Sequence, residues 1–361
     1  MRFPEFSGEW EKCSIQDYGE VVTGNTPPTS HAEYYKNGSC LWASPADLGI
    51  NKNITETKTK LSFSGFKKTR NIPKGSVLVT CIGSTIGKMG MATETMSTNQ
   101  QINSIVVNGK SNSNFVYYAI CRAFPRYLSE VGVQAVPILS KANFEKLPNY
   151  TTCRKEQDKI GYFFNLLDER IATQNKIIEK MESLIKGIAH TVAGMGKPNV
   201  RIKECLECTS STLQESEVSD LGTYPVYGAN GIVGYLNSYN TPDEAIYIVK
   251  DGSGVGSVAY VKGRCSATGT LNILTAKQNY SLQFLYYLLK VFNYDPYKTG
   301  MAIPHIYFKD YGNTMIFCPP YADQLRYAQM LGAIDTKLLL EKNYLINLNC
   351  QKQYLLRLMF I

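Results

Sequence analysis

The chain has few histidines and no long apolar segments, and each of these shortages makes one class of function less plausible. Only three histidines, His31, His190 and His305, occur in 361 residues. They leave little for acid-base or triad catalysis, which commonly depends on imidazole. No apolar run reaches the roughly 18 residues of a membrane span, and the first residues carry no signal-peptide pattern. We therefore expect a cytoplasmic protein in which catalysis by histidine is disfavoured.

The cysteines are scattered rather than arranged as a framework. There are ten of them, which suits reduced thiols in the cytosol. Cys205 and Cys208 have the spacing of half a zinc site, but no second pair lies near them in the sequence. We therefore expect no metal site in the chain.

Acidic residues are almost absent from two long stretches. Residues 57–129 hold one acid, Glu94, against ten lysines and arginines, and residues 252–322 hold two acids against six bases. The bases are interleaved with Asn, Gln, Ser, Thr and Tyr, which suits phosphate contacts combined with hydrogen bonds to base edges. Either stretch alone could be a solvated surface. Their repetition favours nucleic-acid binding.

One sequence pattern occurs twice, at an offset of about 167 to 169 residues, which is too long for a solenoid repeat. The pattern therefore indicates two homologous domains in tandem. The matching pairs are Val79–Gly87 with Ile248–Gly256, Asn103 with Asn272, Val136-Pro137 with Ile303-Pro304, Glu156-Gln157 with Asp323-Gln324, and Asp168 with Asp335.

Each copy ends in an apolar seam with alternating spacings of four and three residues. Such a narrow stripe is typical of a coiled coil, and the obvious partner of each helix is the other copy. A polar residue interrupts each seam at the equivalent position, Gln174 in the first and Glu341 in the second. We expect these two residues to fix the register in which the helices pair. The seam residues are Ile160, Phe164, Leu167, Ile171, Gln174, Ile178, Met181, Ile185 and Ile188, then Tyr327, Leu331, Ile334, Leu338, Glu341, Leu345, Leu348, Lys352 and Leu355.

These patterns predict an α+β protein with two homologous mixed domains, each followed by a long helix. The two helices should pair as an antiparallel coiled coil with pseudo-two-fold symmetry. Within the domains we expect a turn and strand at 74–80, a strand at 102–107 and short helices at 114–121 and 282–289. The predicted divisions are residues 1–151 for the first domain, 152–196 for its helix and linker, 197–317 for the second domain and 318–361 for its helix.

Several segments resemble the specificity subunit of type I restriction-modification enzymes. The succession of domain, long helix, domain and long helix is similar to the arrangement in that family, and the similarity covers nearly the whole chain. The helix starts at 154–160 and 318–324 resemble those of the family, except that Asp323 stands in place of the family's Glu and the first start lacks the prolines. The opening Tyr224–Tyr235, the tetrapeptide Asp168–Ile171 and the closing Tyr354–Phe360 are also similar.

The resemblance implies a non-catalytic chain with two target recognition domains. In the family, each domain reads one half of a bipartite site in double-stranded DNA, and the paired helices hold the domains a fixed distance apart. It also implies partners: two methyltransferase subunits that modify adenine with S-adenosylmethionine, and restriction subunits, the motor-nucleases, that use ATP and Mg. The methyltransferase interface would involve segments 152–193 and 318–361. No cofactor is expected in this chain itself.

Two other functions stay open. A DNA methyltransferase is suggested by Cys318-Pro319-Pro320-Tyr321, although cysteine replaces the polar residue that should bind the amino group, and the prolines suit a helix start better. A coiled-coil adaptor that binds no nucleic acid is the second. The glycine loop Gly252–Gly256 resembles a nucleotide-binding loop, but a strand pattern follows it, so we predict a hairpin turn.

Candidate base-reading residues lie in the expected turns, where polar side chains can reach base edges. A turn hydrogen bond or a phosphate contact is the alternative for each of them. The candidates are Ser84, Thr85, Lys88, Asn99, Gln100 and Gln101 in the first domain, and Tyr227, Asn230, Lys250, Asp251, Ser253, Arg264, Thr268, Thr270 and His305 in the second. Lys67, Lys68 and Arg70 are the candidate phosphate ligands.

Overall fold

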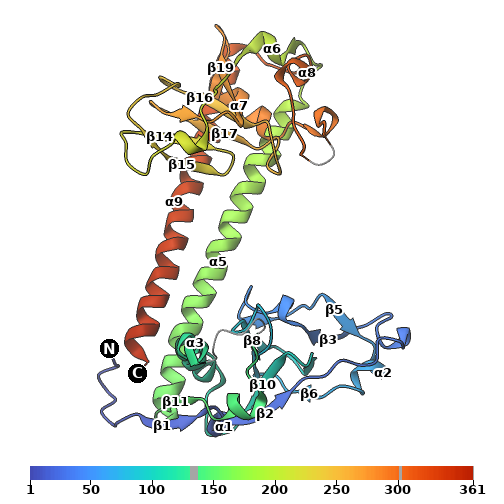
Figure 1. The fold of residues 1–361 in the computed structure, drawn as a ribbon, viewed down its shortest axis with the longest axis vertical. Coiled ribbons are helices and arrows are strands. Elements are labelled where there is room, and N and C mark those ends of the chain that lie inside the picture. Colours follow the sequence, from blue (N-terminus) through green and yellow to red (C-terminus); the bar gives the residue numbers. More distant parts are fainter. Residues whose placement is uncertain (131–136, 301–302, 361) are drawn as a thin grey trace. The chain divides into compact units, whose positions relative to one another are not determined.

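The computed structural model describes residues 1–130, 137–300 and 303–360, and the chain folds as two compact units. The first contains Met1–Gln174 with Tyr344–Ile361, and the second contains Asn175–Asn343. Helices α5 (Arg154–Ala193) and α9 (Tyr321–Met359) each contribute to both units (Figure 1). Val136, the repeat partner of Ile303, lies outside the described residues.

The first unit is built on two sheets, and Val, Ile and Leu dominate the central strands β10 (Ile102–Val107) and β7 (Val77–Thr80) of the larger one. The larger sheet has the order β2 (Gly19–Thr23), β10, β7, β8 (Met89–Ala92) and β4 (Asn53–Ile54). The smaller has the order β5 (Thr59–Leu61), β3 (Cys40–Ala43), β9 (Met96–Thr98) and β6 (Asn71–Ile72). The predicted strand 102–107 is confirmed, and so are the turn and strand predicted within 74–80, where the strand is Val77–Thr80.

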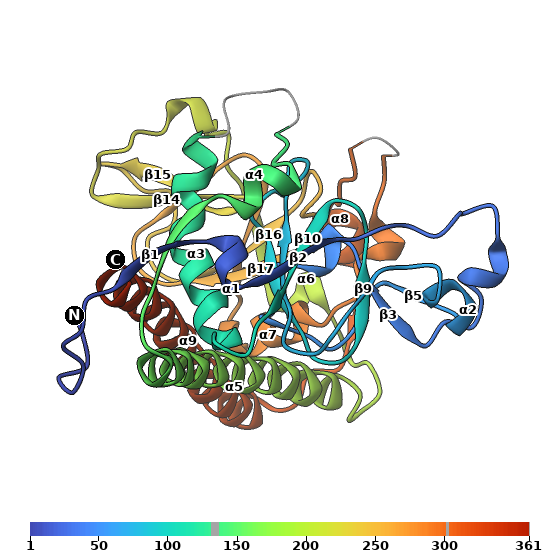
Figure 2. The ribbon, with the colours of Figure 1, turned by 90° about the horizontal axis from the view of Figure 1, so that it is seen from below.

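The core of this unit forms two layers because side chains alternate across β7. Val77 and Val79 pack with helix α3 (Ser113–Glu130) on one face of the larger sheet. Leu78 packs with residues of the smaller sheet on the other face. Figure 2 shows α3 running close to α5 and to the short helix α1 (Ile15–Tyr18). The predicted helix 114–121 is therefore present but longer than expected.

The second unit repeats this topology with fewer strands. Its larger sheet has the order β13 (Leu206–Ser210), β19 (Leu271–Ala276), β16 (Ala245–Val249) and β17 (Val258–Val261), which matches β2, β10, β7 and β8. Its smaller sheet has β15 (Gly231–Leu236), β14 (Tyr224–Gly228) and β18 (Ser266–Ala267). Helix α7 (Leu282–Lys290) takes the place of α3. The internal repeat predicted from the sequence is confirmed.

Short elements complete both units and also correspond in pairs. Where both long helices begin, β1 (Glu11–Ser14) pairs with β11 (Pro148–Thr151), and β12 (Val200–Arg201) pairs with β20 (Met315–Ile316). The remaining helices are α2 (Phe63–Phe66), α4 (Lys141–Glu145), α6 (Ile202–Cys205) and α8 (Phe308–Tyr311). Single 3-10 turns occur at Ala32–Tyr34, Pro45–Asp47, Glu215–Glu217 and Asp295–Tyr297.

The two long helices run antiparallel within each unit. In the first, the Lys352 ammonium lies 2.5 Å from an oxygen of Asp168. In the second, Lys342 lies 2.6 Å from Glu182, and the Tyr327 hydroxyl lies 3.3 Å from the sulfur atom of Met195. All eighteen residues of the predicted seam are buried or half-buried, as expected for side chains that face a partner helix.

The C-terminal end of α9 enters the core of the first unit. Leu356, Met359 and Phe360 belong to the same buried cluster as the side chains of α3. The Phe360 ring lies 5.3 to 5.9 Å from the rings of Phe115 and Trp10, measured between centroids. The chain's two ends therefore lie together, as Figures 1 and 2 show.

Neither a membrane-spanning helix nor a cluster of metal ligands occurs in the residues that the structure describes. None of their helices is both long and apolar enough to span a bilayer. No group of three or more His, Cys, Asp or Glu side chains in these residues is arranged to hold a metal ion.

Candidate nucleic-acid interface

The turn between β7 and β8 is held by backbone hydrogen bonds that glycine makes possible. Gly83 and Gly87 have φ angles of 94° and 89°, a region that other residues rarely adopt. The Gly83 N–H donates to the Pro137 carbonyl over 3.0 Å, and the Gly87 N–H donates to the Thr80 carbonyl over 2.9 Å. The turn is thereby joined to the segment that begins at Pro137.

The turn between β16 and β17 has the same construction. Gly252 and Gly256 have φ angles of 93° and 88°. The Gly252 N–H donates to the Pro304 carbonyl over 2.9 Å, and the Gly256 N–H donates to the Val249 carbonyl over 2.9 Å. Strand β17 follows this turn. The predicted hairpin is confirmed.

A second loop lies beside each turn, and it too is duplicated. The Cys81 N–H donates to the Gln101 carbonyl over 2.8 Å, and the Lys250 N–H donates to the Thr270 carbonyl over 3.0 Å. Because Cys81 and Lys250 occupy equivalent positions, the loops 99–101 and 268–270 are held against equivalent turns. Each unit therefore brings two candidate base-reading loops together.

Side chains in these loops differ in their availability to a ligand. Asn99 is buried and its amide contacts Gln101, with the Gln101 N–H donating to Asn99 Oδ1 over 2.9 Å. Thr268 is buried in the same way, and its hydroxyl shares a hydrogen bond of 2.8 Å with that of Thr270. Both buried residues therefore shape their loops. The other candidates here are exposed or half-buried: Ser84, Thr85, Lys88, Gln100, Gln101, Lys250, Asp251, Ser253, Thr270 and His305.

The predicted phosphate ligands of the first unit lie next to its reading loop. Asn25 joins the two: its Nδ2 donates to the Lys68 carbonyl over 2.9 Å, and its Oδ1 accepts from the Arg70 N–H over 2.8 Å. The next residue, Thr26, donates its hydroxyl hydrogen to Gln100 Oε1 over 2.5 Å. Lys67, Lys68 and Arg70 have exposed side chains. Cationic and base-reading candidates thus share one surface.

Arg264 is the predicted reader that the structure places away from the others. It follows β17, at the end of that strand opposite Ser253. Its guanidinium lies 5.1 Å from the centroid of the Tyr239 ring, and a hydrogen bond with Tyr224 raises its pKa. Tyr227 instead pairs with Ala267, one residue before the loop 268–270. Asn230 is exposed in the turn after β14.

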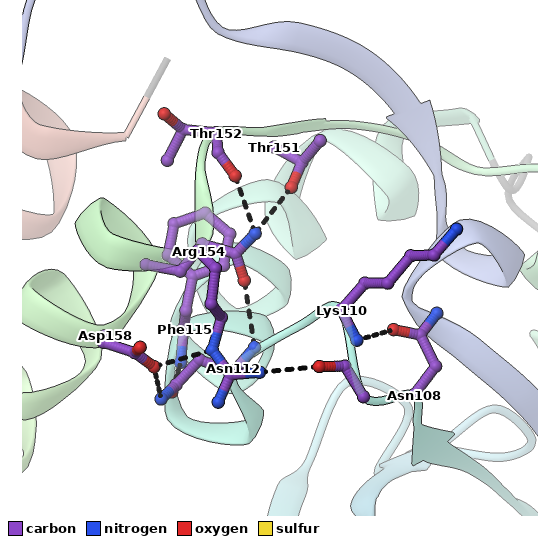
Figure 3. Close-up of polar contacts among 10 residues, drawn as sticks. Asn108, Lys110, Asn112, Phe115, Thr151, Thr152, Arg154 and Asp158 are labelled. Carbon is purple, nitrogen blue, oxygen red and sulfur yellow. Dashed lines mark hydrogen bonds and ion pairs between the residues drawn. The ribbon is translucent and has the colours of Figure 1, made fainter.

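The repeated glutamine near the start of each long helix fastens that helix to its domain. Gln157 is buried and accepts the Asn112 N–H over 2.9 Å, while its amide donates to the Thr151 hydroxyl and the Thr152 carbonyl. Figure 3 labels these three partners, Asn112, Thr151 and Thr152. Gln324 accepts the Ser281 N–H over 2.9 Å and donates to the Pro319 carbonyl. The shared Glu/Asp-Gln pattern therefore has a structural reason.

A second attachment uses the repeated aspartates. The Tyr118 hydroxyl donates to Asp168 Oδ2 over 2.5 Å, and Tyr287 makes the equivalent contact with Asp335 over 3.4 Å. In the first unit alone, Lys52 also donates to the Tyr118 hydroxyl over 3.0 Å. The sequence signal for this attachment was the aspartate pair of the repeat. Its tyrosine partners could not be identified from spacing.

Comparison with known proteins identifies the family. A sequence model of the type I restriction modification DNA specificity domain matches residues 7–183 and again residues 197–349. The chain belongs to this family.

Curated relatives in the family cover different shares of the chain. The type I restriction enzyme HindI specificity subunit of Haemophilus influenzae is 27% identical over 49% of this chain and 40% of its own length. The MjaIX specificity subunit of Methanocaldococcus jannaschii is 29% identical over 48% of this chain and 42% of its own length. The chain thus spans about two-fifths of these relatives. The EcoprrI specificity subunit of Escherichia coli is 20% identical over 91% of this chain and 88% of its own length.

Solved structures share the fold over nearly the whole chain. The type I restriction-modification S subunit from M. genitalium superposes with a TM-score of 0.68, at 18% identity over 98% of this chain and 96% of the other. A chain from a study of complex assembly and conformational transition in a type I system has a TM-score of 0.55, at 15% identity over 96% of both chains. The predicted fold class, with two homologous domains and paired long helices, is confirmed.

Proposed function

We propose that this chain is the DNA-reading subunit of a type I restriction-modification system and carries out no chemistry itself. Each unit reads one half of a bipartite site in double-stranded DNA with its duplicated turn and loop. Membership of the specificity family supports this proposal. So does the clustering of polar and cationic side chains on the loops described above, which suits base and phosphate contacts.

One observation carries the proposal: the two turns share a backbone but differ in their side chains. Thr85 corresponds to Gly254, Lys88 to Ser257, and Gln101 to Thr270, while the backbone hydrogen bonds are the same. Bases are distinguished by the donors and acceptors that side chains present in the groove. The two half-sites should therefore differ in sequence.

The long helices have two further roles in this proposal. Their seam sets the number of base pairs between the half-sites, because α5 and α9 each run without a break from one unit into the other. Their outer faces, within segments 152–193 and 318–361, dock two methyltransferase subunits that use S-adenosylmethionine. Exposed apolar side chains at Tyr162, Leu184 and Leu339 support such docking. Restriction subunits that use ATP and Mg join the same complex.

Mapping of methylated adenines tests the proposal directly. The chain is co-expressed with the methyltransferase subunit of its own genome, and the host DNA is sequenced by a single-molecule method that detects methylation. We expect a bipartite motif with a fixed unspecified gap, modified on both strands only when this chain is present. An assembled complex without chain-dependent methylation would leave a DNA-binding or assembly adaptor as the better description.

Exchange of the two domains tests the division of labour. A chain in which residues 1–151 and 197–317 have changed places should recognise the two half-sites in inverted order, with an unchanged gap. Retention of the original site would contradict reading by two separate domains.

A further inference from the structure

We infer that Phe63 is an apolar wedge that enters the DNA stack beside the half-site read by the first unit. The inference rests on the proposed function. Phe63 is 66% exposed, and it begins helix α2, which packs against β3 and β5 (Figure 1). An exposed phenylalanine adds little to folding, since its free energy of burial is largely unused. It is available to a ligand that offers an apolar slot.

The backbone that carries Phe63 is fixed by its neighbours. The Ser62 N–H donates to the Tyr34 carbonyl over 2.8 Å, and the Ser62 hydroxyl donates to the Glu33 carbonyl over 2.7 Å. Gly65 packs so closely that an added Cβ would lie 2.6 Å from the Tyr34 carbonyl oxygen. The ring is thus presented from a rigid turn, and little conformational entropy is lost when it binds.

The surroundings of the ring are cationic. The Lys67 ammonium lies 4.6 Å from the centroid of the Phe63 ring, and Lys68 and Arg70 follow. Two carboxylates of this region are paired: Glu33 lies 2.9 Å from a ring nitrogen of His31, and Glu56 lies 2.6 Å from the ammonium of Lys60. A phosphate backbone is therefore attracted to this turn, whereas an acidic protein surface would offer no base stack for the ring.

The turn is continuous with the reading loop of the first unit. Asn25 hydrogen-bonds to the main chain of Lys68 and Arg70, and the adjacent Thr26 hydrogen-bonds to Gln100. Known minor-groove proteins insert phenylalanine or leucine between base steps while nearby cations hold the phosphates. Phe63 has this arrangement: a rigid apolar ring, flanking lysines and a base-reading loop on one surface.

A wedge and a phosphate ligand predict different salt dependence. Stacking of an aromatic ring on a base releases no counterions, so removal of the ring should weaken binding equally at all salt concentrations. Removal of a phosphate contact lowers the slope of log affinity against log salt by about 0.9. The two kinds of residue are therefore distinguishable in one assay.

The experiment uses the complex of this chain with its methyltransferase subunit and a duplex that carries the mapped site. Affinity is measured from 50 to 200 mM salt for wild type, Phe63→Ala, Phe63→Leu, Lys67→Ala and Leu128→Ala. Leu128, 41% exposed on α3, is the matched control for loss of an exposed apolar side chain. A second readout is 2-aminopurine fluorescence, with the probe placed in turn at each adenine in or beside the first half-site.

We expect Phe63→Ala to weaken binding about 10- to 100-fold with an unchanged salt slope, and to abolish the fluorescence increase that wild type produces. Phe63→Leu should keep most of both signals, Lys67→Ala should lower the slope, and Leu128→Ala should behave as wild type. If Phe63→Ala binds the duplex as tightly as wild type, the inference is wrong. It is also wrong if the variant binds more weakly only because it no longer assembles with the methyltransferase subunit. Failure of the wild-type complex to prefer any sequence overturns the proposed function instead.

Discussion

Replacement of Phe360 by alanine should selectively destabilise the first unit. The Phe360 ring is 5% exposed, and its centroid lies 5.9 Å from Trp10, 5.3 Å from Phe115 and 5.8 Å from Phe164. A buried phenylalanine replaced by alanine typically costs about 3–5 kcal/mol. Phe360 lies one residue beyond α9, where neighbours can move into the space, so we expect about 3 kcal/mol.

The assay follows from the distribution of tryptophan. The chain has two, Trp10 and Trp42, and both belong to the first unit. Tryptophan fluorescence during urea unfolding therefore reports this unit alone. With a slope of about 2.5–3 kcal/mol per molar urea for a unit of this size, the loss corresponds to a midpoint lowered by about 1 M.

Leu358→Ala is the matched control, because Leu358 lies on the same turn of α9 but is 38% exposed. A surface change of this kind should alter stability by no more than about 0.5 kcal/mol, which is about 0.2 M in the midpoint. If Phe360→Ala shifts the fluorescence midpoint no further than this control, the last turn of the chain does not complete the core of the first unit, and the reasoning is refuted.

Three further predictions concern Lys52, the repeated glycine turns and the polar residues of the seam. Burial lowers the pKa of Lys52 to about 8 from 10.5, so the unfolded chain binds more protons between those values and stability should rise with pH there. Lys52→Met should flatten this rise in urea titrations at several pH values; a flat wild-type profile contradicts the argument. Gly87→Ala should lower stability by about 2–3 kcal/mol, because φ is positive and the new Cβ would lie 2.7 Å from a ring carbon of α3. Gly252→Ala, at an equivalent φ in open space, should lose only about 1 kcal/mol, and equal losses in calorimetry would count against the steric explanation. Combined Gln174→Leu and Glu341→Leu should keep or raise the melting temperature while relaxing the gap between methylated half-sites, whereas an unchanged gap would exclude a register role.

Much of the fold could be predicted because the sequence is duplicated, so that each pattern occurs twice and the second copy supports the interpretation of the first. The 4-3 spacing predicted both long helices, and the repeated glycines predicted both turns, since positive φ restricts those positions to few residue types. The insertion of Phe360 could not be predicted. It lies beyond the last seam residue, and nothing in its spacing connects it with Trp10, which is far away in the sequence.

The candidate interface was predicted less completely, because residue type does not reveal orientation. Asn99 is a candidate base reader because its amide could bind a base edge, but that amide is buried against Gln101. Arg264 is a candidate because a guanidinium in a loop can read guanine, yet strand β17 separates it from the turn that carries Ser253. The sequence gives no signal for the role we propose for Phe63, because a phenylalanine in a sequence is usually interpreted as core. These assignments depend on the direction of single side chains.

The position of Phe360 also constrains the order of folding during synthesis. Most of the first unit, residues 1–174, is made before α9, yet its aromatic core waits for a side chain made roughly 200 residues after Phe164. At about 5–20 residues per second, this delay is of the order of 10–40 s. During this interval the faces of Trp10 and Phe115 that Phe360 later covers are open to chaperones or to another nascent chain. Translation speed through α9 should therefore influence how much of the protein folds correctly.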